Sequence, residues 1–262
     1  MTDVILEVVD SVATITLNRP ESMNAMNDNL MGALLAAMGE VTAQKQIRVV
    51  ILTGAGRGFC AGADLKGVAG EQQAAPTTTQ EESGHELFNT TMRAIHNCPV
   101  PTIARVNGAA GGGGFGLALS CDLVVAARSA FFVATFGPRL GIVPDLGSTW
   151  NLPRIVGRAR ALGISMLGER ITADQAENWG LIWKCVDDAE LDTEVERLAN
   201  ALAATSPEAM TRIRSSIDSA FVNNFSSQLD LELEHQNVLI PRNMIEGAKA
   251  FVEKREPHFK GR

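Results

Sequence analysis

The chain has 262 residues, which is enough for one large domain, or one domain with an appendage, around a full core. Its 23 lysine and arginine residues are outnumbered by 30 aspartate and glutamate residues, which gives a net charge of −7. This balance disfavours nucleic-acid binding through the phosphate backbone. No apolar run approaches the length of a membrane span, so no such span is expected.

The N-terminus and the cysteines indicate a cytoplasmic protein. Met1-Thr2-Asp3 is followed directly by a strand pattern, which is not the pattern of a signal peptide. The cysteines lack CxxC spacing and lie in apolar stretches, so we expect buried reduced thiols instead of a metal site or disulfides. They are Cys60, Cys98, Cys121 and Cys185.

The first elements along the chain are predicted to be a hairpin and a helix. Val4 to Val9 and Val12 to Leu17 are β-branched runs separated by Asp10-Ser11, which is typical of a β-hairpin. Asn27-Asp28 then provides capping residues for a helix. Its apolar residues recur at helical spacing and are expected to fill the core: Leu30, Met31, Leu34, Leu35, Met38 and Val41.

Strands and helices then alternate, which indicates an α/β fold. Val49 to Leu52 is an apolar run typical of a strand buried on both faces. Lys66 to Ser83 lacks periodicity and is predicted to be disordered or a lid. A helix from about Glu82 to Asn97 and strands at Thr102 to Val106 and Leu123 to Ala127 follow. Beyond Leu191 only helical patterns remain, namely Val195 to Ala203, Pro207 to Phe221, Phe225 to Leu239 and Arg242 to Arg255.

A glycine run, Gly111 to Gly116, lies between a strand pattern and an apolar helix pattern. Such a junction exposes backbone N–H groups that can hold an anion or a developing oxyanion. The spacing fits the dinucleotide-binding GxGxxG pattern, which also expects a carboxylate about 20 residues further on. After Asp122 the next carboxylate is Asp145, so we favour an oxyanion site, with close packing of the glycines as the alternative.

Several motifs occur together in one order. They are Leu17-Asn18-Arg19-Pro20, Phe59 to Lys66, Asn107-Gly108 with the glycine run, Ser120-Cys121-Asp122, Phe251 to Arg255 and Phe259-Lys260. As a set they resemble the crotonase family, the enoyl-CoA hydratase and isomerase superfamily. The resemblance implies an α/β spiral of repeated ββα units over residues 1–190 and a helical region over residues 191–262. It also implies that the helical region builds homotrimers or dimers of trimers.

The resemblance further implies an acyl-CoA substrate, with no metal and no cofactor other than the substrate's own CoA. The backbone N–H groups of Ala63 and Gly113 would bind the thioester oxygen. Ala61, Ala63, Asp64, Leu65, Lys66 and Gly113 would line the substrate path. Lys66 would pair with a phosphate, and Phe251 and Lys254 would reach the CoA of a neighbouring subunit. Outside this motif context, both lysines are typical solvated surface residues.

This chain departs from the two-glutamate pattern of the family's hydratases. Those positions fall on Gly116 and near Phe136-Gly137, and the chain has no aspartate or glutamate between Asp122 and Asp145. Asp145 is therefore the candidate acid–base residue, and burial would raise its pKa. A helix cap is the alternative role for an aspartate in this loop.

A single carboxylate suits isomerisation, because it can remove a proton from C2 and return one at C4. The leading interpretation is a Δ3-Δ2-enoyl-CoA isomerase, or an epoxyphenylacetyl-CoA-type isomerase, with Asp145 as proton shuttle. One alternative is a hydratase with a non-standard acid–base set. Others are an aryl-CoA dehalogenase with His85 as the activating histidine, and a non-catalytic acyl-CoA-binding protein. His96, His235 and His258 have no neighbouring pattern that points to catalysis.

Overall fold

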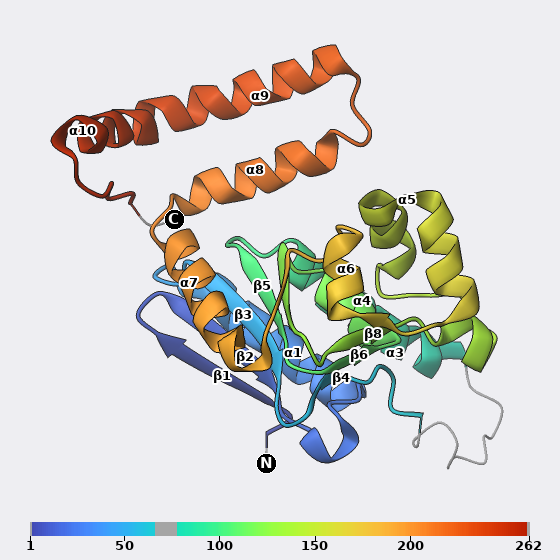
Figure 1. Cartoon of the computed structure of the whole chain (residues 1–262). Helices are drawn as coiled ribbons and strands as arrows, with labels where there is room; N and C mark the ends of the chain where they lie inside the picture. The colour runs from blue at the N-terminus through green and yellow to red at the C-terminus, as the bar shows by residue number, and fades with distance from the viewer. Residues whose placement is uncertain (1, 66–77, 261–262) are drawn as a thin grey trace.

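The computed structural model describes residues 2–65 and 78–260, and the side chains of helix α3 from residue 85 onwards. Within these residues the strands form two sheets (Figure 1). The large sheet has the order β1 (Val4–Val9), β2 (Val12–Leu17), β3 (Val49–Gly54), β5 (Thr102–Val106), β7 (Leu123–Ala127) and β10 (Lys184–Val186). The small sheet has the order β4 (Gly58–Cys60), β6 (Ala109–Gly111), β8 (Phe131–Val133) and β9 (Ile171–Thr172).

Helices separate the strands along the chain. They are α1 (Asp28–Ala43), α3 (Thr78–His96), α4 (Gly113–Leu119), α5 (Ser148–Leu167), α6 (Ala173–Asn178), α7 (Leu191–Ala203), α8 (Pro207–Ser219), α9 (Phe225–Leu239) and α10 (Ile245–Glu253). π-helical turns lie at Phe136–Leu140 and Ile240–Met244, and 3-10 turns at Pro20–Ser22 and Asp188–Glu190.

The two sheets are built from a repeated pair of strands. In the pairs β3/β4, β5/β6 and β7/β8, the first strand joins the large sheet and the second joins the small sheet. β3, β5 and β7 are parallel neighbours, and so are β4, β6 and β8. Each of these three pairs is followed by a helix, so each ββα repeat adds one strand to each sheet. The predicted α/β fold of repeated ββα units is confirmed.

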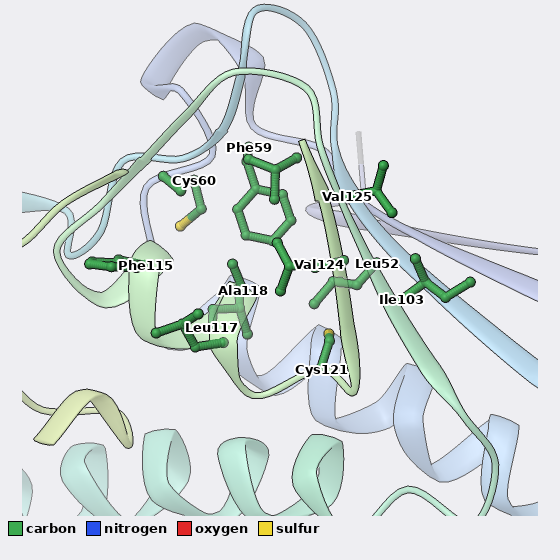
Figure 2. Close-up of a cluster of buried hydrophobic side chains, with 14 of the residues drawn as sticks. Leu52, Phe59, Cys60, Ile103, Phe115, Leu117, Ala118, Cys121, Val124 and Val125 are labelled. Carbon is green, nitrogen blue, oxygen red and sulfur yellow. The ribbon is translucent and has the colours of Figure 1, made fainter. Parts of the chain in front are cut away.

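Apolar residues of the predicted strands and helices form the hydrophobic core. β1 and β2 form the predicted antiparallel hairpin, and all six residues of β3 are buried. The Asn27 side chain caps α1 by accepting a hydrogen bond from the Leu30 N–H at 2.9 Å. Figure 2 shows side chains of the large sheet, of β4 and of α4, among them Phe59 and Phe115, gathered in one cluster.

The four cysteines are buried, as predicted, and they are not joined by disulfide bonds. Burial raises the pKa of the Cys60 thiol to about 12, so this side chain is an inert part of the core at neutral pH. Burial also raises the pKa of Cys121 and Cys185.

The C-terminal helices fall into a packed part and a projecting part. α7 lies against the large sheet and buries Leu191, Val195 and Leu198 in the core. α8, α9 and α10 extend away from the two sheets (Figure 1). The predicted division into a core and a helical region after residue 190 stays a prediction. α7 follows that position in sequence but belongs to the packed part.

Arg214 of α8 joins the projecting part to the core. Its Nε donates to the Asp122 carboxylate at 2.6 Å, and its Nη2 donates to the Val100 carbonyl at 3.0 Å. Asp122 also accepts a hydrogen bond from the Thr102 N–H at 2.7 Å. The Ser120-Cys121-Asp122 motif therefore connects β5, at Thr102, with the first projecting helix.

The projecting helices expose large apolar side chains. These include Ile217 on α8, Phe225 and Leu233 on α9, and Phe251 and Val252 on α10. In the part of the chain that the structure describes, no helix combines the length and the apolar character needed to cross a membrane.

Candidate active site

The candidate site lies where three parallel strands of the small sheet end. Because the carboxyl ends of parallel neighbours meet at one edge, the segments that follow β4, β6 and β8 lie side by side. They enclose a cavity of about 90 Å³. It is lined by Met26, Ala61, Gly62, Ala63, Leu65, Phe88, Gly112, Gly113, Thr135, Phe136, Leu140, Ile142, Asp145 and Leu146.

The two predicted oxyanion donors come from adjacent strand ends. Gly62 precedes Ala63 and has a φ of 97°, a conformation that favours glycine. A Cβ on Gly62 would lie 2.8 Å from the carbonyl oxygen of Gly111 and 3.2 Å from the nitrogen of Gly113. Only a residue without a side chain lets the two segments approach this closely.

The hydrogen bonds around Ala63 show that its N–H points away from Met26, its partner in a parallel bridge. In the parallel bridge between Met26 and Ala63, the Met26 N–H donates to the Gly62 carbonyl at 2.7 Å, and the Asp64 N–H donates to the Met26 carbonyl at 2.9 Å. The N–H of the central residue of such a bridge points to the opposite side. Gly113 is the first residue of α4, so its N–H has no acceptor within the helix.

Two polar side chains hold the loop around Ala63 in place. The buried Asn24 amide donates to the carbonyls of Gly58 at 2.9 Å and Phe59 at 3.1 Å, and Asn24 Oδ1 accepts from the Arg19 N–H at 2.9 Å. The Arg19 guanidinium donates to the Asp64 carboxylate at 2.9 Å. Asp64, which we predict to bind substrate, therefore also ties the Leu17 to Pro20 motif to this loop.

Asp145 reaches the same cavity from the loop before α5. Its carbonyl accepts from the Ser148 N–H at 2.9 Å, and α5 has Gly147 at its N-cap position with no side-chain hydrogen bond there. The Asp145 carboxylate is therefore not used as a helix cap. The residue retains contact with solvent, yet it stands among apolar neighbours, and this desolvation raises its pKa as predicted.

His85 of α3 lies near Asp145. Its charge lowers the pKa of the Asp145 carboxyl, against the larger effect of burial. Phe88, three residues further along α3 and so on the same helix face, lines the cavity. The structure thus brings His85, the histidine singled out from the sequence, toward the candidate site.

Neither of the two positions at which the family resemblance leads us to expect glutamate in a hydratase carries a carboxylate here, and the first has no room for a side chain. A Cβ on Gly116 would lie 2.6 Å from the Leu146 carbonyl oxygen and 2.9 Å from the Ser148 hydroxyl oxygen. Phe136 occupies the second region and is itself buried in the cavity wall. Asp145 is the one carboxylate among the described residues that line the cavity.

The remaining predicted site residues differ in where they lie. Ala61 and Leu65 line the cavity. Lys66 lies outside the described residues, and so does most of the predicted lid of residues 66–83, whose last part is the start of α3. Phe251 and Lys254 belong to the projecting part and do not line the cavity of their own chain. Their contact with a neighbouring subunit's CoA stays a prediction.

A larger apolar groove of about 470 Å³ lies elsewhere, between α5 and α8. Trp150, Ile213 and Phe221 contribute to its apolar wall. Two of its charged groups, Asp122 and Arg214, are paired with each other. The groove does not include the glycine run, so it is not the candidate catalytic site.

The comparisons with known proteins agree with this geometry. The family model described as enoyl-CoA hydratase/isomerase matches residues 7–262 of the chain. The chain belongs to the enoyl-CoA hydratase/isomerase family. It is an acyl-CoA enzyme of the crotonase fold, as the motifs predicted.

Relatives within the family carry more than one activity. The chain is 41% identical to the 1,2-epoxyphenylacetyl-CoA isomerase of Escherichia coli, over 99% of this chain and 98% of the relative. It is also 41% identical to a probable enoyl-CoA hydratase of Rhodobacter capsulatus, over 98% of this chain and 97% of the relative. The crystal structure of an enoyl-CoA hydratase from Polaromonas superposes with a TM-score of 0.92 at 34% identity, covering 98% of this chain and 99% of that one.

Proposed function

We propose that this enzyme isomerises an acyl-CoA thioester through an enolate, as a Δ3-Δ2-enoyl-CoA isomerase or an epoxyphenylacetyl-CoA-type isomerase. The observation that carries the proposal is one cavity with two juxtaposed backbone donors, Ala63 and Gly113, and a single lining carboxylate, Asp145. The likeness to the Escherichia coli 1,2-epoxyphenylacetyl-CoA isomerase supports the same reaction class.

The backbone donors supply the electrostatic part of the mechanism. Removing a proton from C2 moves negative charge onto the thioester oxygen. Two N–H groups fixed by the sheet stabilise this charge without any side-chain rearrangement. Loss of one such donor typically costs about 3 kcal/mol of transition-state stabilisation.

Asp145 supplies the proton transfer. Its carboxylate takes the proton from C2, and the resulting carboxylic acid returns it to another carbon of the acyl group, so that substrate and product are isomers. Hydration needs a water molecule to be activated and a proton to be delivered as well, which the hydratases of this type divide between two glutamates. The packing around Gly116 excludes the first of these, which favours isomerisation over hydration.

A parallel assay tests the proposed reaction. The enzyme is offered a 2-enoyl-CoA, a 3-enoyl-CoA and 1,2-epoxyphenylacetyl-CoA under the same conditions. We expect turnover of the second or the third, or of both, and little hydration of the first. Rapid hydration of the 2-enoyl-CoA with no isomerisation of the other two would overturn the proposal.

The pH profile of the reaction should report the environment of Asp145. Only the ionised carboxylate can accept a proton, so kcat/KM falls as the pH drops through its pKa. Because desolvation by the apolar neighbours of Asp145 raises this pKa, the acidic limb should lie above the ordinary value for aspartate, about 3.9. A pH titration of kcat/KM measures it. An acidic limb at or below the ordinary value would contradict the assigned environment.

A second candidate is hydrolytic dehalogenation of an aryl-CoA. In that reaction an aspartate attacks the ring carbon, chloride leaves, and a histidine activates water to hydrolyse the aryl-aspartate ester. The nearness of His85 to Asp145 favours this candidate. Release of chloride from 4-chlorobenzoyl-CoA, lost in His85→Gln, would support it.

The proposal also includes the oligomeric state and the cellular compartment of the enzyme. We infer a homotrimer or a dimer of trimers, because α8, α9 and α10 expose large apolar side chains that association would cover. In that assembly Phe251 and Lys254 would approach the CoA of a neighbouring subunit. Light scattering coupled to size-exclusion chromatography measures the mass. We expect the enzyme to act in the cytoplasm, with CoA entering only as part of the substrate.

A further inference from the structure

The hydroxyl group of Thr135 is a polar group of the cavity that the proposed proton transfer does not use. Thr135 follows β8 and lies between the buried residues Ala134 and Phe136. It precedes the π-helical turn, where a threonine often caps the following N–H groups with its side chain. Here the side chain makes no such bond, and within the described part of the chain no hydrogen bond of this hydroxyl occurs.

This hydroxyl lies beside the glycine run. Thr135 Oγ1 lies 3.2 Å from the point where a Cβ on Gly112 would stand, immediately before the Gly113 donor. Gly112 has a φ of 49°, a conformation that favours glycine, and glycine places no side chain against the Thr135 hydroxyl. Thr135 and Asp145 are the two polar side chains among the described residues that line the cavity, and the other lining side chains are apolar.

The thioester oxygen does not need this third donor. A carbonyl oxygen has two lone pairs, and the N–H groups of Ala63 and Gly113 can engage both. A bound hydrocarbon chain would leave the Thr135 hydroxyl covered and unpaired, which is unfavourable. An acyl group with an oxygen of its own would instead give the hydroxyl an acceptor and strengthen binding.

We propose that Thr135 is a specificity-determining residue that donates a hydrogen bond to an oxygen atom of the acyl group, and so favours oxygenated acyl-CoA substrates over hydrocarbon ones. The inference rests on the proposed site and deepens it. Of the two proposed isomerase substrates, this role of Thr135 favours 1,2-epoxyphenylacetyl-CoA, which carries an epoxide oxygen, over a 3-enoyl-CoA.

Equilibrium binding tests this role without relying on turnover. The ligands are 2-hydroxyphenylacetyl-CoA, which carries a ring oxygen, and phenylacetyl-CoA, which does not. Thr135→Val keeps the shape of the side chain and removes its hydroxyl. We expect it to weaken binding of the hydroxylated ligand roughly tenfold to a hundredfold. Binding of phenylacetyl-CoA should be unchanged or up to about tenfold tighter, because valine leaves no hydroxyl unpaired against the apolar ring. Thr135→Ser, which keeps the hydroxyl, should restore most of the difference.

The unmodified ring ligand serves as the folding control, because its binding requires an intact site. Equal weakening of both ligands by Thr135→Val, or no change in either, would overturn the inference. If the wild-type enzyme isomerised neither 3-enoyl-CoA nor 1,2-epoxyphenylacetyl-CoA, the proposed function would fail. The binding difference would still decide the role of Thr135.

Discussion

Asp145→Asn should lower the isomerase kcat by roughly 100- to 10,000-fold while leaving acyl-CoA binding nearly intact, the loss expected when a positioned acid–base group is removed. The amide has the shape of the carboxylate but cannot accept a proton from C2. Because the Asp145 side chain does not cap α5, the substitution should leave the helix and the fold undisturbed. Steady-state kinetics, together with equilibrium binding of phenylacetyl-CoA, separate the two effects.

Asp230→Asn provides the matched control for this substitution. Asp230 is an exposed carboxylate on α9, in the projecting part and away from the cavity. The control should retain the wild-type kcat. A full isomerase rate in Asp145→Asn, with intact binding, would exclude Asp145 as the proton shuttle.

Gly62→Ala should reduce kcat by roughly 100- to 1,000-fold, comparable to the loss of an oxyanion donor. The added methyl group would meet backbone atoms, the Gly111 carbonyl at 2.8 Å and the Gly113 nitrogen at 3.2 Å, which cannot rotate away as a side chain can. The two strand ends must therefore separate, and the two donors with them. Kinetics and thermal unfolding of the same preparation measure the effects on catalysis and stability.

Gly180→Ala separates this effect from backbone strain. Gly180 also has a positive φ, 70°, but a Cβ there would meet nothing within 4 Å. Both substitutions introduce the strain of a left-handed alanine, of the order of 1–3 kcal/mol, so both should lower the melting temperature. Only Gly62→Ala should lose most of its activity. Equal activity in the two variants would argue against donors held in place by Gly62.

Local patterns were sufficient to predict most elements of the fold. The Asn27 cap and the apolar run of β3 depend on neighbours in sequence, and both occur as predicted. Which part of the molecule a helix packs against depends on residues distant in sequence, so the local pattern does not predict it. α7 has the amphipathic pattern of the helices that follow it, yet it packs on the large sheet, while α8 to α10 project from it.

The site residues differ in the same way. Gly113 and Asp145 could be proposed from the sequence because a glycine run and an isolated carboxylate stand out in it. Asn24 and the proposed specificity residue Thr135 could not, because their neighbours are distant in sequence: Asn24 contacts β4, and Thr135 lies beside Gly112. Their residue types are common, so only the approach of these segments in space reveals them.

The central claim is that this enzyme forms a thioester enolate by removing a C2 proton with Asp145. Incubation of phenylacetyl-CoA with the enzyme in D₂O, followed by NMR of the C2 protons, tests this step even when no net reaction occurs. We expect deuterium to enter C2 with the wild-type enzyme and not with Asp145→Asn. Absence of exchange with the wild type, or equal exchange with the variant, would contradict the account.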